Sequence, residues 1–134
     1  MLLEIDHHSG LPIYRQVIDQ LRQQIMAGRL SEGEQLISVR ELAAQLRVNP
    51  MTISKAYALL EVEGLLERRR GIGLFVARLR RDQKTRTKAK LLEDILRKAA
   101  VTAIQFGIPE EKTQEMLTKL YSKYDSQTRS QSNE

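Results

Sequence analysis

Two helix starts stand eleven residues apart in the middle of the chain, and they restrict the possible folds more than any other feature. Ser38 and Glu41 have the spacing of a capping box, in which the hydroxyl accepts a hydrogen bond from the amide of Glu41 and the carboxylate reaches back. Asn49 and Pro50 are residue types favoured at the N-cap and at the first helical position. The pattern predicts a helix from Ser38 to Leu46, a three-residue turn and a second helix that starts at Pro50.

A third helix is predicted before this pair, and a hairpin is predicted after it. Between Pro12 and Gly28, apolar residues recur at spacings of three and four, as in an amphipathic helix. The helix that starts at Pro50 is expected to end near Glu63, because Gly64 favours a left-handed stop. The next residues, up to Arg78, contain two short apolar runs around a basic, glycine-rich tip, which indicates two strands. Two strands alone are marginal in water, so we expect them to lean on the helices.

These elements together predict a winged helix-turn-helix domain over residues 1–78. In such a domain the second helix of the pair projects its N-terminal residues into the major groove of duplex DNA. The hairpin, or wing, contacts the adjacent backbone or minor groove. The predicted fold class is therefore mostly α with a small β-hairpin, followed by a C-terminal helical dimerisation tail.

The rest of the chain divides into a basic tract and two further helical patterns. Residues 79–90 show no apolar periodicity, so they form either a linker or the polar start of a long helix. Apolar residues then recur at helical spacing over residues 91–124, on both sides of Gly107. Residues 125–134 are polar and are predicted to be disordered.

Positive charge is concentrated around the hairpin and the tract that follows it. The chain has 22 Lys and Arg against 17 Asp and Glu, for a net charge of +5. Residues 68–90 contain ten of these cations and one acidic residue, Asp82. Such a stripe indicates nucleic-acid binding, although charge alone also fits a solvated segment. Aromatic residues make up only 4% of the chain, which disfavours a module that stacks single-stranded bases.

The composition excludes several other classes of protein. The absence of Cys excludes disulfides, thiolate metal sites and Cys nucleophiles. No apolar run approaches the ~18 residues of a membrane helix, and the N-terminus lacks the features of an export signal, so we expect a cytoplasmic protein. The sequence contains no nucleophile–base pair or phosphate-binding loop, and His7 and His8 lie where the chain is expected to fray. We therefore expect neither an enzyme nor a cofactor or metal site.

Six short motifs, in order between residues 11 and 77, resemble the GntR family of bacterial transcription regulators. They are P-x-Y-x-Q from Pro12, G-x-L-x-x-G from Gly28, S-V-R-E-L from Ser38, V-N-P-x-T from Val48, K-A-Y-x-x-L-E-x-x-G from Lys55 and R-R-G-x-G-x-F-V from Arg69. Each motif is weakly specific alone, but their ordered combination is highly specific. The short chain is similar to the YtrA-type subgroup, which has only a short two-helix tail. Three positions depart from the family pattern: Ile37 replaces the usual Pro, Ile72 the usual Lys or similar residue, and Leu74 the usual Thr.

The resemblance implies which residues contact operator DNA. Arg40 matches an Arg that contacts the operator in family members, and a bidentate Arg–guanine pair is the commonest specific base contact. The alternative for Arg40 is a surface ion pair with a nearby Glu. Tyr57 is equally compatible with DNA contact and with the core. The predicted DNA-binding residues are Ser38, Arg40, Asn49, Met51, Thr52, Ser54 and Lys55 in the two helices, and Arg68, Arg69, Arg70 and Gly71 in the wing.

The resemblance also implies that the tail pairs two copies of the chain. One helix-turn-helix reads only a few base pairs, so useful specificity normally requires two copies on a palindrome. The alternative is a helical hairpin folded onto the N-terminal domain. The predicted dimerisation residues are Leu91, Leu92, Ile95, Leu96, Ala99, Ala103, Phe106, Met116, Leu117, Leu120 and Tyr121.

The predicted function is a homodimeric repressor that binds a palindromic operator in double-stranded DNA. Family analogy suggests control of a transporter operon. The alternative is a winged helix used for protein contacts, which predicts a neutral or apolar recognition face, and RNA binding is a further alternative. Whether a small-molecule effector exists is left open, because no polar cluster marks a pocket.

Overall fold

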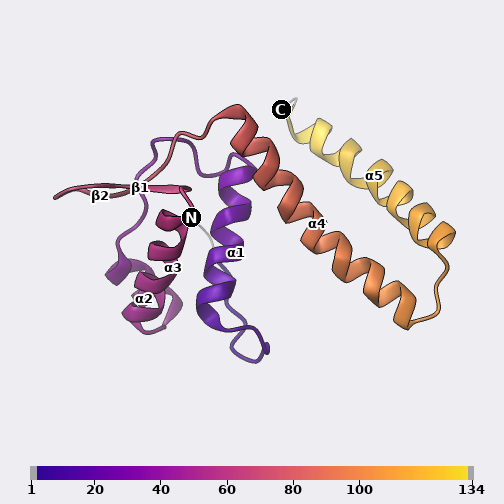
Figure 1. Cartoon of the computed structure of the whole chain (residues 1–134), viewed down its shortest axis with the longest axis horizontal. Helices are drawn as coiled ribbons and strands as arrows, with labels where there is room; N and C mark the ends of the chain where they lie inside the picture. The colour runs from indigo at the N-terminus through magenta and orange to yellow at the C-terminus, as the bar shows by residue number, and fades with distance from the viewer. Residues whose placement is uncertain (1–2, 133–134) are drawn as a thin grey trace. The chain divides into compact units, whose positions relative to one another are not determined.

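The structure is a computed structural model that describes residues 3–132, with side chains described for residues 3–125. Over the described residues, five helices and one antiparallel hairpin follow one another along the chain (Figure 1). They are α1 (Ile13–Met26), α2 (Val39–Leu46), α3 (Pro50–Val62), β1 (Leu66–Arg69), β2 (Gly73–Val76), α4 (Arg81–Gln105) and α5 (Glu110–Ser132). The chain divides into two compact units, one before and one after the bond between Ala89 and Lys90.

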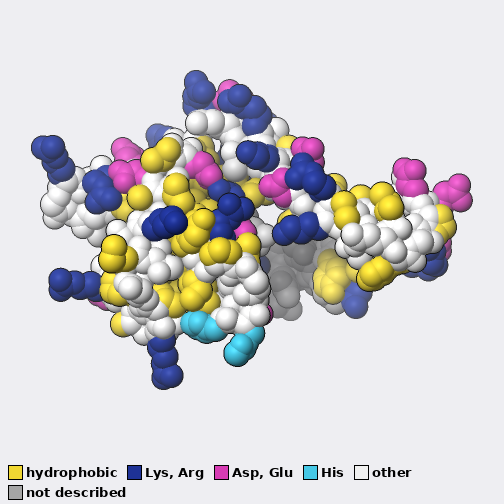
Figure 2. Space-filling model, turned by 60° about the horizontal axis from the view of Figure 1, so that its bottom comes forward, with side chains coloured by type: hydrophobic (Ala, Val, Ile, Leu, Met, Phe, Trp, Pro, Cys, Tyr) yellow, Lys and Arg dark blue, Asp and Glu magenta, His cyan; other side chains and the backbone are white. Residues whose placement is uncertain are grey.

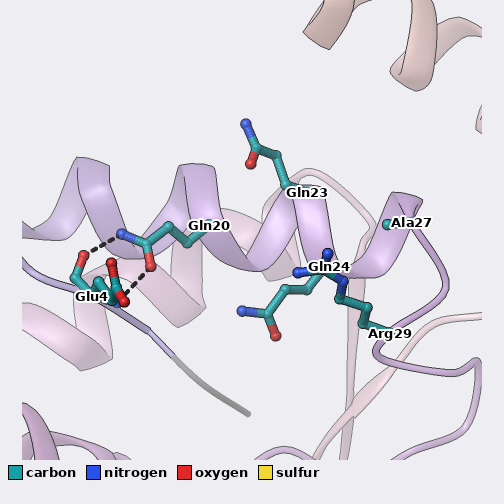
Figure 3. A pocket seen from close by; sticks show the side chains of 6 residues that line it. All are labelled: Glu4, Gln20, Gln23, Gln24, Ala27 and Arg29. Carbon is teal, nitrogen blue, oxygen red and sulfur yellow. Dashed lines mark hydrogen bonds between the residues drawn. The ribbon is translucent and has the colours of Figure 1, made fainter. Parts of the chain in front are cut away.

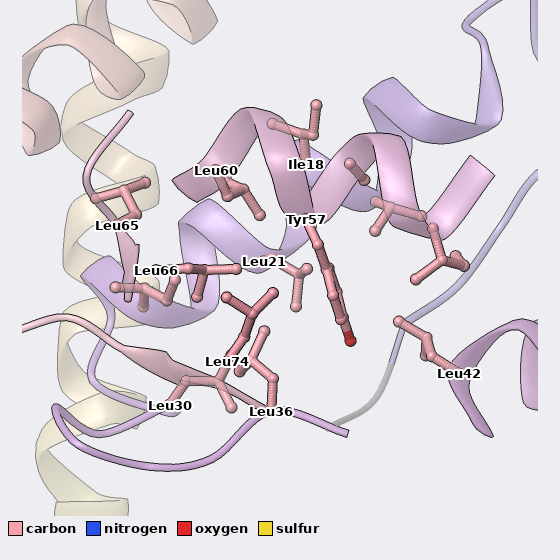
Figure 4. Packing of buried hydrophobic residues seen from close by; sticks show 14 of the residues in the cluster. Ile18, Leu21, Leu30, Leu36, Leu42, Tyr57, Leu60, Leu65, Leu66 and Leu74 are labelled. Carbon is pink, nitrogen blue, oxygen red and sulfur yellow. The ribbon is translucent and has the colours of Figure 1, made fainter. Parts of the chain in front are cut away.

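The core of the first unit lies between α1, α3 and the hairpin. Helix α1 packs against α3, α2 packs against α3, and α3 also contacts β1. Figure 4 shows side chains from α1, α3 and β2 meeting in one cluster, among them Leu21, Leu60 and Leu74. Burying a Leu side chain is worth roughly 1.5–3 kcal/mol, so this cluster holds the three helices together. The fully buried side chains of largest volume are Leu21, Leu42, Ile53, Leu60, Val17 and Val76.

The turn between α2 and α3 is built from the local signals of the sequence. The hydroxyl Oγ of Ser38 accepts a hydrogen bond from the amide of Glu41 at 3.2 Å, which caps α2. Arg47 ends α2 in the left-handed conformation, with φ 56°. The Asn49 Oδ1 then accepts a hydrogen bond from the amide of Met51 at 2.9 Å and caps α3. Both helices therefore begin where the capping residues predict.

The second strand of the hairpin has partners on both sides. Its register with β1 runs from Leu66 opposite Val76 to Arg69 opposite Gly73. On its other edge, the amide of Leu36 donates to the carbonyl of Leu74 at 2.8 Å, and the segment forms a β-bridge. The sequence pattern treats residues 28–36 as a plain turn. The extended stretch near Leu36 was missed because its conformation depends on pairing with residues far along the chain.

The second compact unit contains most of α4 and all of α5. Helix α4 begins at Arg81, so the basic tract is the start of a long helix and not a linker. Helix α5 continues to Ser132, whereas residues 125–134 are predicted from sequence to be disordered. Adding a residue to an existing helix costs far less than starting one, which composition alone does not reveal. Residues 133–134 lie outside the described residues.

Candidate nucleic-acid interface

The first turns of α3 face solvent. Met51 is 77% exposed, Ser54 and Lys55 are exposed, and Thr52 is half-buried. The opposite face of α3 is anchored in the core by residues such as Ile53. The helix can thus present polar groups and one apolar side chain to a groove without unfolding any of its own contacts.

Tyr57 belongs to the core, which resolves the open choice between a core role and a surface role. It is 3% exposed, and its hydroxyl donates a hydrogen bond to the carbonyl oxygen of Ile37 at 2.8 Å. Burial raises the pKa of the Tyr57 phenol well above its usual range, so the hydroxyl remains a donor. The bond ties α3 to the segment that leads into α2, and so it fixes the two helices of the pair relative to each other.

Arg40 and Arg70 are the cations of the predicted site that remain unengaged. Both side chains are exposed, and within residues 3–125 neither forms an ion pair or a hydrogen bond. The ion pair with a nearby Glu that was the alternative role for Arg40 is therefore not formed in this part of the chain. Both guanidinium groups are free to meet an external anion.

The other cations of the predicted site have partners within the chain. The ammonium Nζ of Lys55 lies 3.9 Å from the centroid of the Tyr14 ring. Arg68 forms an ion pair with Glu61 at 3.2 Å, and the Arg69 guanidinium lies 3.9 Å from the centroid of the Phe75 ring. Exposed pairs of this kind are worth ~0–1 kcal/mol, so a phosphate can replace them at little cost. Until a phosphate binds, these contacts hold the side chains of Lys55, Arg68 and Arg69 in place.

A groove of about 280 Å³ separates α3 from the wing. Its lining includes Ser38 and Ser54 from the helix pair, together with Arg68, Ile72 and Gly73 from the hairpin. The groove thus joins the exposed ends of both predicted contact regions. Figure 2 shows Lys and Arg side chains projecting from several points of the molecular surface, with hydrophobic atoms exposed between them.

A second hollow lies along α1 and has a different chemistry. Its volume is about 470 Å³, and its lining residues are Glu4, Gln20, Gln23, Gln24, Ala27 and Arg29 (Figure 3). The Gln20 amide is already engaged with the backbone of Glu4, at 2.8 Å and 2.5 Å. Across the described residues, no group of three or more His, Cys, Asp or Glu is placed to hold a metal ion. None of the described helices is long and apolar enough to cross a membrane.

An exposed helix start, a basic wing beside it and a three-helix core together define a winged helix-turn-helix DNA-binding protein. The sequence pattern described as "Bacterial regulatory proteins, gntR family" matches residues 13–76. The HTH-type transcriptional repressor YtrA of Bacillus subtilis (strain 168) is 34% identical over 119 residues, which cover 89% of this chain and 92% of YtrA. The chain therefore belongs to the GntR family of bacterial regulatory proteins.

Solved structures agree with this assignment. A GntR family transcriptional regulator from Listeria monocytogenes has a TM-score of 0.74 and 30% identity, over 86% of this chain and 98% of that chain. The DNA-binding domain of AraR in complex with operator ORX1 has a TM-score of 0.51 and 32% identity, over 56% of this chain and 96% of that chain. The predicted winged helix-turn-helix with C-terminal helices and the YtrA-type resemblance are confirmed, and the relatives are transcriptional regulators.

Proposed function

We propose that this DNA-binding regulator is a cytoplasmic repressor that acts as a homodimer on a palindromic operator. The exposed apolar surface of the tail carries this proposal. The AraR domain, which has a similar fold, was solved in complex with an operator, and this supports DNA binding by the first unit. Control of a transporter operon is part of the proposal by family analogy, and a footprint on the DNA upstream of the chain's own reading frame tests it.

The start of α3 and the neighbouring Arg40 read bases in this proposal. Arg40 pairs with a guanine, Met51 contacts a thymine methyl group, and Thr52 and Ser54 bond to bases or phosphates. Asn49 has its side-chain oxygen engaged as a cap, which leaves its amide hydrogens for the DNA. Apart from Met51, these groups are polar, and Lys55 and the Arg residues of the wing add positive charge, whereas a recognition face for protein contacts would be neutral or apolar.

The wing binds the DNA backbone in this proposal. Arg68, Arg69 and Arg70 lie next to Gly71, which has φ 74° and no side chain to keep a phosphate away. The two Arg residues with internal partners exchange a weak contact for a charge-assisted hydrogen bond to a phosphate oxygen.

Each tail helix carries a one-sided apolar stripe that its own unit leaves exposed. On α4, Leu92, Ile95 and Leu96 are 49%, 52% and 41% exposed, and Ala99 completes the i, i+3, i+4, i+7 spacing. The α5 residues Leu117, Leu120, Tyr121 and Tyr124 repeat that spacing and are exposed too. Several large apolar side chains exposed along one helix face are typical of an interaction site. A second copy of the chain carries the same stripes, and a twofold interface requires the same surface on both copies.

Replacing Leu96 with Glu tests the dimer. A carboxylate buried in an apolar interface is costly, so L96E is expected to be a monomer with at least tenfold weaker operator binding. Sedimentation measures the mass, and titration of a labelled duplex measures the affinity. The control is Q105E, which introduces the same charge at an exposed position of α4 outside the stripe. An L96E protein with the dimer's mass would refute the interface.

A further inference from the structure

The tip of the wing is held from outside the hairpin by the side chain of Gln35. Its Nε2 donates a hydrogen bond to the carbonyl oxygen of Ile72 at 3.1 Å. The amide of Ile72 donates to the carbonyl of Arg69 at 3.0 Å and closes the turn. The backbone amide and carbonyl of Ile72 are therefore both hydrogen-bonded within the protein, and only its side chain remains available for a partner.

The side-chain amide of Gln35 also lies close to the backbone of Gly73. Gly73 has φ 143°, and a Cβ built there would lie 3.0 Å from the Nε2 of Gln35. The β-bridge between Gln35 and Phe75 holds the amide in register with the strand. The Gln35 side chain, the bridge to Phe75 and the turn bond thus support the wing tip together.

The wing tip carries an apolar side chain next to basic ones. Ile72 is 63% exposed, although Arg69 and Arg70 precede it in the same turn. An Ile this exposed contributes little to stability, and a Lys or Arg here would add another phosphate contact instead. The flanking cations can bring the tip to phosphates, and the bound backbone of the turn lowers the ordering cost on binding.

We propose that Ile72 is an apolar wedge that enters the minor groove and partly unstacks one base step, and that Gln35 is its positioning residue. This inference rests on the proposed DNA contact of the wing. Apolar wedges open flexible pyrimidine–purine steps such as TA most easily, and stiff A-tracts resist them. The wing then selects sequence through the deformability of one step beside the half-site, without a hydrogen bond to any base.

The test compares full-length wild type, I72A and I72K in a selection from a randomised duplex library, followed by affinity titrations over a salt series. Wild type is expected to enrich TA or CA at one flanking step. I72A should lose that enrichment and bind about fivefold more weakly per half-site, with an unchanged salt slope. I72K should also lose the enrichment while its salt slope steepens by about 1 per wing. V62A is the control, because Val62 is an exposed apolar residue at the C-terminal end of α3, opposite the end with the predicted base contacts.

The positioning role of Gln35 is tested through its dependence on Ile72. Q35A should weaken the step preference, and the double variant Q35A/I72A should bind no more weakly than I72A alone, because one residue acts through the other. A purely structural role for Gln35 would instead give additive losses.

Two results would overturn the inference, and they are distinguishable. If I72A keeps the affinity and step preference of the wild type while both bind DNA, the wedge is wrong and DNA recognition by the protein stands. If the wild type enriches no duplex sequence at all, the proposed function fails together with the wedge.

Discussion

At the scale of single residues, the cations of the candidate DNA-binding surface differ in whether another group of the chain already engages them. Arg40 and Arg70 have no partner among the described side chains, whereas Lys55 lies over a ring and Arg68 is paired with Glu61. A free guanidinium gains the full charge-assisted bond, and a paired one gains only the difference. Loss of Arg40 should therefore be more severe than loss of Lys55.

Replacing Arg40 with Ala is expected to weaken operator binding by about tenfold to a hundredfold, the value of one bidentate base contact. The variant should also relax specificity at a single base pair of each half-site. Because Arg40 is exposed and lacks an internal partner in the described chain, the midpoint of urea unfolding should not change. Titrations on operators substituted at each position measure both effects.

R29A is the matched control, since Arg29 is exposed in the turn after α1. A uniform loss of affinity across all substituted operators would assign Arg40 to a phosphate and contradict the base contact.

From the sequence, only those features of the candidate site that depend on residues close together in the chain could be predicted. Helical periodicity correctly places Met51, Ser54 and Lys55 on the exposed face of α3. It does not show that the ammonium of Lys55 lies over Tyr14, because that contact joins residues far apart in the chain. Gln35 was missed for the same reason: a lone Gln beside a turn has no distinctive pattern until the wing folds against it.

At the scale of elements, the helices of the first unit follow from local chemistry more closely than the rest of the chain. Ser38 and Asn49 cap their helices as predicted, because a side-chain cap acts over two or three residues. The start of α4 at Arg81 and the length of α5 do not depend on such a signal. Polar residues are compatible with both helix and coil, so composition could not decide between them.

The buried hydroxyl of Tyr57, which joins α3 to the segment before α2, makes the free energy of unfolding depend on pH in the alkaline range. Burial raises the pKa of Tyr57 in the folded state, so above pH ~10 the unfolded chain loses this proton and the folded chain keeps it. The unfolded state then binds fewer protons, and the free energy of unfolding must fall as pH rises. Urea unfolding on either side of pH ~10 measures this decline.

Y57F has no phenol to titrate, so its free energy of unfolding should fall less than that of the wild type above pH ~10. Near neutral pH, Y57F should be less stable by ~1–3 kcal/mol, because the Ile37 carbonyl loses its hydrogen-bond donor. Y14F is the control, because Tyr14 is only half-buried and Phe keeps the ring that contacts Lys55. An identical alkaline decline in Y57F and wild type would show that this phenol is not responsible.

At the scale of the whole molecule, the two compact units differ in the kind of side chain that they expose. The first unit buries most of its apolar residues and exposes polar and basic groups, with Met51 and Ile72 among them, at one helix start and one turn. The second exposes apolar stripes, which a soluble monomer rarely does. Because a single recognition helix reads only a few base pairs, pairing through the second unit would raise the specificity of the first in the proposed homodimer.

Operator binding by such a dimer should depend steeply on salt. If each protomer neutralises about three to five phosphates, counterion release gives a slope of log affinity against log salt of about −5 to −9. Affinity should then fall by about 10³ to 10⁵ between roughly 50 mM and 200 mM salt. R70Q removes one free cation per protomer and should reduce the slope by about 2, and the monomeric L96E should show about half of it. A nearly salt-independent affinity would contradict the cationic wing, and an unchanged slope in L96E would mean that one protomer alone makes the phosphate contacts.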